Sequence, residues 1–168
     1  MKYIPHNYQK YASDFIEKHM TAAVFLDMGL GKTIITLSAV NNLCLDTFEV
    51  QKVLVIAPLR VARDTWKAEI EKWEHLKHLK YAVAIGTETE RISALKRPAH
   101  IYVINRENVD WLVSNTKFDY EMIVIDELSS FKNHQSKRFK ALMKVRPKVK
   151  RIVGLTGTPA SNGLMDLF

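Results

Sequence analysis

The sequence predicts an α/β fold in which a mostly parallel central sheet is covered by helices on both faces. Short apolar runs alternate with longer segments of helical period along the whole chain, and this alternation is typical of a parallel sheet in a three-layer domain. The prolines at positions 58, 98 and 147 fall between these segments, where they interrupt neither a helix nor a strand. A length of 168 residues suits one domain of common size, so we expect a single domain over residues 1–168.

The apolar runs are expected to be strands and the periodic segments helices. In chain order, the expected elements are helix 7–19, strand 22–26, helix 33–45, strand 52–57, helix 61–73, strand 80–85, helix 88–95, strand 100–104, helix 106–115, strand 122–125, helix 136–144 and strand 151–155. Trp66 and Trp73 are seven residues apart on one expected helix, and with Tyr81 they are interpreted as packing residues rather than as a platform for stacked bases.

The turn between the first strand and the second helix is predicted to bind phosphate. Residues 25–33 read Phe-Leu-Asp-Met-Gly-Leu-Gly-Lys-Thr, and the backbone N–H groups of such a turn converge at a helix N-terminus, whose dipole favours an anion. Lys32 adds a positive charge for the β- and γ-phosphates, and the Thr33 hydroxyl is placed to ligate magnesium. The strict phosphate-loop pattern has glycine where this chain has Leu26, so a plain glycine-rich turn with a surface lysine is the alternative.

A pair of carboxylates is predicted to complete a nucleotide site. Asp126 and Glu127 directly follow the apolar strand 122–125, and ligands of parallel α/β sheets gather at the carboxyl ends of the strands. We expect Asp126 to hold the magnesium, usually through water, because this ion keeps much of its hydration shell. Glu127 is expected to orient or deprotonate the water that attacks the γ-phosphate. Two acids after a strand are more often a solvated strand end, and the phosphate loop upstream is what favours the catalytic interpretation.

The charge distribution indicates a polyanionic partner. The net charge is +7, yet residues 128–165 contain nine Lys or Arg and no Asp or Glu, so the rest of the chain carries 16 basic and 18 acidic residues. A local excess of this kind is the expected footprint of nucleic acid, because neutralised phosphates release their counterions. Lys137 and Arg138, at the start of the expected helix 136–144, are candidate contacts. A merely solvated helix face is the alternative.

Composition argues against several other classes of protein. No apolar run reaches the ~18 residues of a membrane span, and residues 1–6 lack the apolar core of a secretory signal. Cys44 is the only cysteine, so no internal disulfide can form and nothing indicates an oxidising compartment. The six histidines show no zinc-ligand spacing. We therefore expect an intracellular, cytoplasmic protein that does not bind a membrane.

Five segments, in order along the chain, match known sequence motifs: Tyr8-Gln9, the phosphate loop at 27–33, a strand and helix at 53–73, the acidic pair with a trailing Lys-Asn at 126–133, and Gly-Leu-Thr-Gly-Thr-Pro at 154–159. Together they resemble the amino-terminal ATPase lobe of superfamily-two helicases, most of all the Swi/Snf-type branch of DNA translocases. In that branch the missing first glycine of the phosphate loop is normal. Leu128-Ser129 stands where the branch more often has Ala or Gly followed by His.

The resemblance implies a RecA-like P-loop domain that uses ATP and magnesium. It implies that Gln9 bonds the edge of adenine. The other nucleotide-binding residues that it implies are Met28, Gly29, Leu30, Gly31, Lys32 and Thr33. The residues implied to relay the nucleotide state to DNA are Thr156, Gly157 and Thr158. The implied nucleic-acid contacts are Arg60, Lys132 and Asn133, with residues 86–87 and 105–107 as weaker candidates.

The expected function is ATP hydrolysis coupled to movement on double-stranded DNA, with Lys32, Asp126 and Glu127 as catalytic residues. In similar enzymes a second RecA-like lobe supplies an arginine finger; this chain ends at Phe168 without one, so we expect weak ATPase activity from it alone and a second lobe in the same or a partner chain. The alternatives are a P-loop enzyme acting on a small molecule, such as a nucleotide kinase, and a non-catalytic DNA-binding module with a vestigial nucleotide site. The lean spacing between motifs hints at a prokaryotic or viral source.

Overall fold

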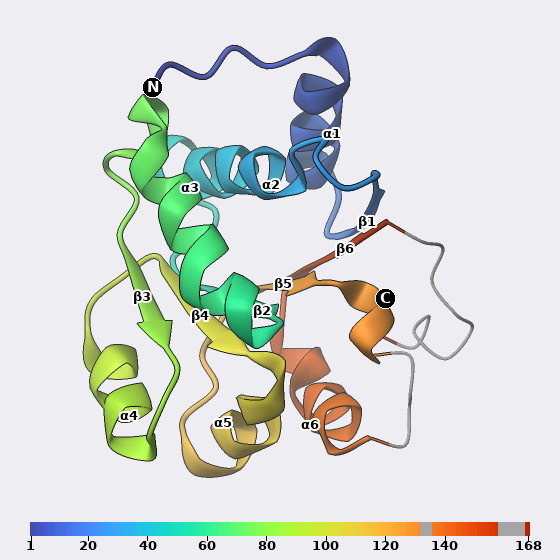
Figure 1. The fold of residues 1–168 in the computed structure, drawn as a ribbon. Coiled ribbons are helices and arrows are strands. Elements are labelled where there is room, and N and C mark those ends of the chain that lie inside the picture. The colour runs from blue at the N-terminus through green and yellow to red at the C-terminus, as the bar shows by residue number, and fades with distance from the viewer. Residues whose placement is uncertain (132–135, 158–166) are drawn as a thin grey trace.

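Six strands form one sheet in the spatial order β1-β6-β5-β2-β4-β3, and every pairing is parallel (Figure 1). The computed structural model describes residues 1–131, 136–157 and 167–168. The strands are β1 (Thr21–Phe25), β2 (Val53–Ala57), β3 (Tyr81–Ala84), β4 (Ile101–Asn105), β5 (Met122–Asp126) and β6 (Arg151–Thr156). Each agrees with the expected strand to within one residue at either end. The predicted site residues Lys132, Asn133 and Thr158 lie outside the described residues.

The helices also lie where the helical periodicity predicts them. They are α1 (Asn7–Lys18), α2 (Lys32–Asn41), α3 (Trp66–Lys72), α4 (Glu88–Lys96), α5 (Val109–Asn115) and α6 (Lys137–Val145). Two of them are lengthened by a π-helical turn, since Asn42–Asp46 continues α2 and Val61–Thr65 leads into α3. Within the described parts of the chain, no helix has the length and apolar character needed to cross a membrane.

The helices form two layers, with α1, α2 and α3 on one face of the sheet and α4, α5 and α6 on the other (Figure 1). Successive side chains of β2 alternate between the two cores: Val53 and Val55 pack on the α1–α3 side, and Leu54 and Ile56 on the α4–α6 side. Because both faces are covered, β2, β4 and β5 are buried at every position. This explains why these strands read as continuous apolar runs rather than as alternating patterns.

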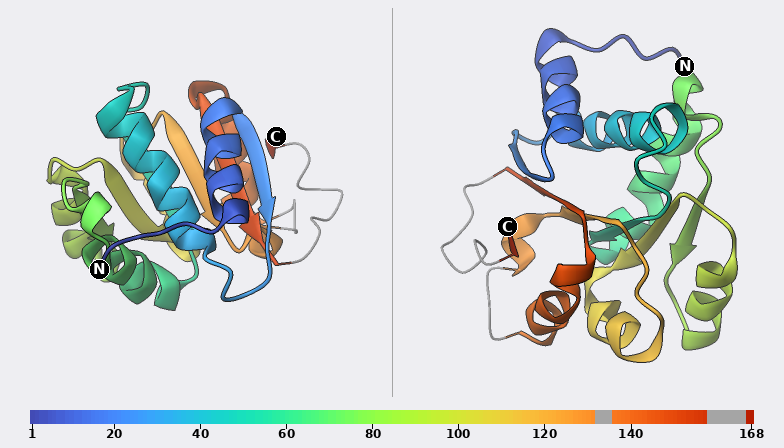
Figure 2. Two further views of the ribbon diagram at one scale, coloured as in Figure 1. Left: turned by 90° about the horizontal axis from the view of Figure 1, so that it is seen from above. Right: turned by 180° about the vertical axis from the view of Figure 1, so that it is seen from behind.

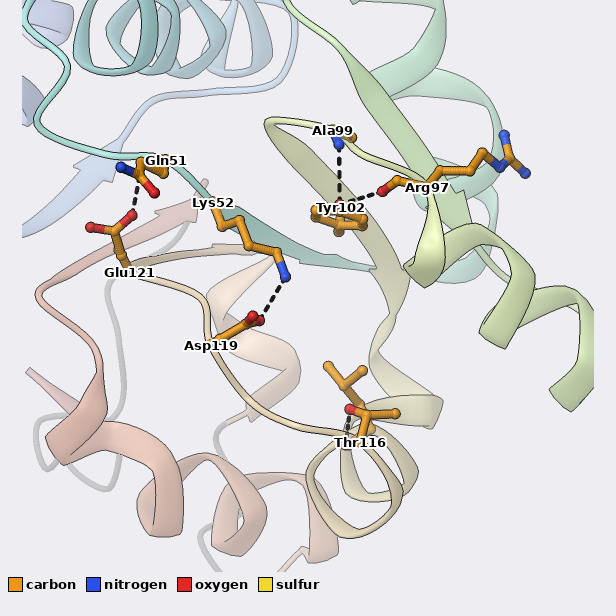
Figure 3. Close-up of polar contacts among 9 residues, drawn as sticks. Gln51, Lys52, Arg97, Ala99, Tyr102, Thr116, Asp119 and Glu121 are labelled. Carbon is orange, nitrogen blue, oxygen red and sulfur yellow. Dashed lines mark hydrogen bonds and ion pairs between the residues drawn. The ribbon is translucent and has the colours of Figure 1, made fainter.

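Polar contacts join neighbouring segments at the amino ends of the central strands (Figure 3). The Lys52 ammonium donates to the Asp119 carboxylate at 2.7 Å, and it also lies 5.1 Å and 5.0 Å from the ring centroids of Tyr102 and Tyr120. These contacts connect the segments that lead into β2 and β5 with a side chain of β4. They lie at the opposite edge of the sheet from the carboxyl ends, where ligands of parallel sheets bind.

The N-terminal segment runs from the end of α3 to the start of α1 (Figure 2). The amino group of Met1 donates to the Lys72 carbonyl at 3.0 Å, and the Met1 carbonyl accepts from the Glu74 N–H at 2.9 Å. The Tyr3 ring packs edge-on against Trp73, with 5.4 Å between ring centroids. These contacts attach the segment that precedes α1 to the end of α3.

Candidate nucleotide-binding site

The loop between β1 and α2 is shaped by two glycines in the left-handed region. Gly29 has φ +85° and Gly31 has φ +89°, a backbone conformation that residues with side chains rarely adopt. Gly31 is the N-cap of α2, and its carbonyl accepts the first helical hydrogen bond from the Ile35 N–H at 3.0 Å. The loop therefore places Lys32 and Thr33 in the first turn of α2, where backbone N–H groups and the helix dipole favour phosphate.

Helix α1 supports this loop from one side. The Leu30 carbonyl accepts hydrogen bonds from the Tyr8 hydroxyl at 2.9 Å and from Nε2 of Gln9 at 3.3 Å. Oε1 of Gln9 accepts from the His6 N–H at 2.9 Å, which ties the same amide to the start of α1. Gln9 thus lies at the phosphate loop, as the motif implies, while its contact with adenine stays a prediction.

A pocket of about 350 Å³ lies beside the loop and the carboxyl end of β5. The predicted site residues that line it are Met28, Gly29, Gly31, Lys32, Thr33, Asp126 and Glu127. The lining residues that were not among the predicted site residues are Asp27, Ile34, Val61, Thr65 and Glu69. Leu30 and Gln9, which are joined by a hydrogen bond, do not line the pocket, although Leu30 lies between two glycines that do. The structure thus brings the two predicted halves of the site, nearly a hundred residues apart in sequence, into one cavity.

Lys32 connects the phosphate loop to the end of β6. Its ammonium donates to the Leu26 carbonyl at 2.7 Å. The Leu26 N–H in turn donates to the Thr156 carbonyl at 3.2 Å, which extends the pairing of β1 with β6 into the loop. A Cβ on Gly157 would lie 3.9 Å from Nζ of Lys32. Thr156 and Gly157 therefore adjoin the phosphate loop, and their part in relaying the nucleotide state to DNA stays a prediction.

Asp126 is the last residue of β5 and is 8% exposed. Its Oδ2 accepts a hydrogen bond from Nε1 of Trp66 at 3.0 Å. Burial raises the pKa of the Asp126 carboxyl above its ordinary value, and the neighbouring Glu127 carboxylate adds to the rise, while the Trp66 hydrogen bond and the Lys32 charge lower it. The carboxylate is thus a largely desolvated ligand whose charge is favoured by a nearby cation.

Trp66 is packed in the core, as predicted, but the sequence interpretation missed its polar contact. Its side chain is fully buried among residues of the α1–α3 core. A buried tryptophan usually finds a hydrogen-bond acceptor for its indole N–H, and that rule was the signal that could have pointed to a polar partner. The sequence offered no means of choosing Asp126 among the available carboxylates.

Glu127 adopts a left-handed backbone conformation with φ +59°. For a residue with a side chain this conformation costs about 1–2 kcal/mol, and such outliers gather at functional sites where the surroundings enforce them. A 3₁₀ turn over Leu128–Phe131 follows directly. The bend turns the chain away from β5 while the Glu127 side chain remains in the lining of the pocket.

The oxygen donors in this pocket fit a magnesium ion. The Thr33 hydroxyl and the Asp126 carboxylate both line it, and Lys32 provides a charge for phosphate in the same cavity. Magnesium is usually held by one or two carboxylates, with phosphates and water supplying the remaining oxygens. One hydroxyl and one carboxylate beside a phosphate loop match this donor set.

The basic segment is less uniform than its sequence suggests. Lys137 is exposed and Arg138 half-buried in the first turn of α6, and Arg60 is exposed just after the carboxyl end of β2. Arg151, counted above with the basic patch, is instead 5% exposed and donates to the Ile16 and Glu17 carbonyls at 3.2 Å and 2.9 Å. The interpretation of all nine charges as a surface patch was therefore wrong, because Arg151 satisfies the carbonyls at the end of α1.

Arg146 also makes internal contacts. Its guanidinium donates to the Leu167 carbonyl at 2.5 Å and to the Val149 carbonyl at 3.0 Å.

Two of the weaker candidates for nucleic-acid contact are Gly86 and Thr87. Gly86 has φ +92°, and Thr87 is the N-cap of α4, where its hydroxyl accepts from the Glu90 N–H at 3.2 Å. Gly86 thus allows the left-handed turn before α4, and Thr87 caps the N-terminus of that helix. The exposed lysines that the structure describes on α6 and between α6 and β6 are Lys137, Lys140, Lys144, Lys148 and Lys150.

The family follows from comparison with known proteins. Residues 12–168 match the model of the SNF2-related domain. The chain belongs to this family. A solved structure, the Sulfolobus solfataricus SWI2/SNF2 ATPase core in complex with dsDNA, superimposes with a TM-score of 0.83 and 27% sequence identity over 100% of this chain. The resemblance and the RecA-like fold class expected from the sequence are thereby confirmed.

Relatives of this SNF2-related domain are longer proteins. Protein p41 of the Acyrthosiphon pisum secondary endosymbiont phage 1 is 39% identical over 174 residues, which cover 99% of this chain and 38% of that protein. The uncharacterized ATP-dependent helicase MG018 of Mycoplasma genitalium is 33% identical over 84% of this chain and 14% of its own length. The chain also spans 36% of the solved Sulfolobus protein.

Proposed function

We propose that this SNF2-related domain is the first RecA-like lobe of an ATP-driven translocase that moves on double-stranded DNA. The observation that carries the proposal is the pocket that contains the phosphate-loop lysine together with both carboxylates at the end of β5. Lys32 binds the β- and γ-phosphates, and Glu127 orients the attacking water. Thr33 and Asp126 hold the magnesium ion, which neutralises charge on the phosphates.

The nucleotide site is tested by titrating the protein with a fluorescent ATP analogue and magnesium. Lys32→Ala is expected to weaken binding by roughly 10- to 100-fold, because a charge-assisted hydrogen bond to phosphate is removed. The matched control is Lys10→Ala, which removes an exposed lysine of α1 paired with Asp14 and should leave affinity unchanged. Wild-type affinity in the Lys32→Ala protein would refute the nucleotide site, provided that thermal melts show both variants folded.

Binding to duplex DNA is the second arm of the proposal. The exposed lysines of α6 support it, and so does the similar Sulfolobus ATPase core, which was solved in complex with dsDNA. The double variant Lys137→Ala/Arg138→Ala is expected to reduce the slope of log affinity against log salt by about two, one for each phosphate that is no longer neutralised. Lys77→Ala, an exposed lysine after α3, is the control. An unchanged slope in the double variant would remove these residues from the interface.

We further propose that full turnover requires a second RecA-like lobe, in the same chain or supplied by a partner. The greater length of the matched relatives supports this view. The 168-residue chain is then expected to bind ATP yet hydrolyse it slowly, with little stimulation by DNA. Measured turnover that is fast and DNA-stimulated in this chain alone would contradict the requirement. The similarity to a phage protein supports a viral or prokaryotic source.

A further inference from the structure

The Trp66 indole makes a hydrogen bond that packing alone does not require. Trp66 is the first residue of α3, its side chain is fully buried, and its Nε1 donates to Oδ2 of Asp126 at 3.0 Å across 60 residues of sequence. We infer that Trp66 is a positioning residue for Asp126, fixing the orientation in which this carboxylate holds magnesium. The inference rests on the proposed nucleotide site and adds a residue to it.

The chemistry of the indole suits this task. It is a donor only, carries no charge and does not titrate, so it directs a carboxylate oxygen at any working pH without a change in its own charge. The ring is rigid and enclosed by the α1–α3 core, so the donor cannot swing away from Asp126. Groups that hydrogen-bond a metal ligand from behind orient it, and their loss typically lowers metal affinity roughly 10- to 100-fold.

The geometry leaves part of the Asp126 carboxylate for a cation. Trp66 donates its one hydrogen bond to Oδ2 of Asp126. A carboxylate accepts about four hydrogen bonds in all, so acceptor positions remain while the same side chain lines the pocket with Lys32 and Thr33. The indole donor restricts rotation of the carboxyl group, which otherwise has a broad, roughly two-fold torsion.

A second indole, that of Trp73, also donates to a carboxylate that lines the pocket. Nε1 of Trp73 donates to Oε2 of Glu69 at 2.6 Å, and Glu69 lines the same pocket. Val61 and Thr65, just before Trp66, line it as well. The segment from Val61 to Trp73 therefore forms one wall of the pocket and holds two of its carboxylates by indole N–H groups.

The deciding experiment is the affinity of Trp66→Phe for a fluorescent ATP analogue, with magnesium and in excess EDTA. Phenylalanine keeps most of the packing and removes the donor. With magnesium, affinity is expected to fall roughly 10- to 100-fold, the usual effect of removing a partner of a metal ligand; in EDTA it should match the wild type. Trp111→Phe is the matched control, because the Trp111 indole donates to Glu88 at 3.3 Å on another part of the domain.

The outcomes of this titration distinguish a positioning role of Trp66 from a purely packing role. Equal magnesium-dependent affinity in Trp66→Phe and wild type would overturn the inference. So would an equal loss with and without magnesium, because that result describes a general loosening of the fold. A wild-type protein that binds no nucleotide would instead overturn the proposed function, and the positioning role with it.

A measurement on the protein without a Trp66 substitution covers the case in which that variant does not fold. The three tryptophans give three indole ¹H–¹⁵N resonances, and Trp73→Phe and Trp111→Phe assign the third to Trp66. The Trp66 resonance is expected to shift on addition of magnesium and the ATP analogue, and also in Asp126→Asn, while the Trp111 resonance stays in place. A Trp66 resonance indifferent to Asp126→Asn would refute the contact.

Discussion

Gly154 of β6 lies directly against Leu128 of the turn that follows β5. A Cβ built on Gly154 would come within 2.8 Å of Cδ2 of Leu128 and within 2.8 Å of Cζ of Phe168. Leu128 is 1% exposed, so this contact is part of the core. The absent side chain at position 154 thus lets the turn after the Asp126-Glu127 pair pack on the strand that ends beside the phosphate loop.

This contact predicts that Gly154→Ala is destabilising. The added methyl group overpacks the contact, and we expect a loss of about 1–3 kcal/mol in the free energy of unfolding. Gly157→Ala is the control three residues along, because a Cβ there meets only ordinary contacts at 3.7 Å and 3.9 Å. That variant should be neutral or gain about 0.5 kcal/mol by restricting the unfolded chain. Urea unfolding of both variants measures the difference, and equal effects would contradict the contact.

The two loop glycines should differ in their sensitivity to alanine. Gly29→Ala meets no atom within 4 Å, so only its left-handed backbone, about 1 kcal/mol, opposes it. Gly31→Ala has the same backbone cost and also brings Cβ to 2.6 Å from Nε2 of Gln9. We expect Gly31→Ala to be the more destabilising by roughly 1 kcal/mol, since Gln9 must give up its bond to Leu30.

A double-mutant cycle checks this explanation. In a Gln9→Ala background the additional cost of Gly31→Ala should largely disappear, because the amide that it displaces is gone. An undiminished cost in that background would mean that Gln9 does not decide the effect, which would then come from the backbone and from the Cγ2 atom of Ile34, 3.1 Å from the added Cβ.

Arg151 is predicted to be a structural residue. Arg151→Met keeps the apolar stem but leaves the Ile16 and Glu17 carbonyls without their guanidinium donor, and we expect a loss of about 2 kcal/mol in thermal or urea unfolding. Lys150→Met, one residue earlier, removes an exposed ion pair with Glu121 and should cost less than about 0.5 kcal/mol. Weaker DNA binding in a fully stable Arg151→Met protein would restore Arg151 to the nucleic-acid surface.

Stability is expected to fall below about pH 6.5, the ordinary pKa of histidine, partly because of His100. Its Nδ1 accepts from the Lys80 backbone N–H at 2.9 Å, a bond that the protonated ring cannot make. Burial lowers the pKa of His100 below its ordinary value, and the Lys80 charge adds to the effect. The folded state therefore binds a proton at His100 less readily than the unfolded state does. The contribution of neutral His100 to the free energy of unfolding is present above the pKa of the unfolded state and is lost as the pH falls through the pKa of the folded state.

His100→Asn tests this titration, since the asparagine oxygen can replace Nδ1 as an acceptor but does not titrate. Between pH 7.5 and pH 5, the wild type should lose about 0.5 kcal/mol more than the variant in urea unfolding. Parallel pH profiles for the two proteins would exclude His100 as a contributor.

Most of the secondary structure could be predicted from the sequence because each element carries its own local pattern. The continuous apolar run of β5 ended at the two acids, and the glycines before Lys32 marked the turn that α2 follows. The Leu26 position, a mismatch to the strict phosphate-loop pattern, did not disturb the loop, since Gly29 and Gly31 provide the left-handed conformations that it needs. Arg151 was wrongly predicted to be exposed because its partners are distant in sequence. A charged side chain is expected at the surface unless the buried groups that it contacts are known.

The sequence alone determined the layered α/β architecture, the position of the phosphate loop and the acidic pair at a strand end, since helical and strand periods and turn residues are local properties. Only the tertiary structure decided that β6 lies between β1 and β5, that Leu128 packs on Gly154, and that Trp66 donates to Asp126. These relationships join segments far apart in the chain. Their physical basis is the complementary shape and hydrogen bonding of buried surfaces, which no single segment encodes.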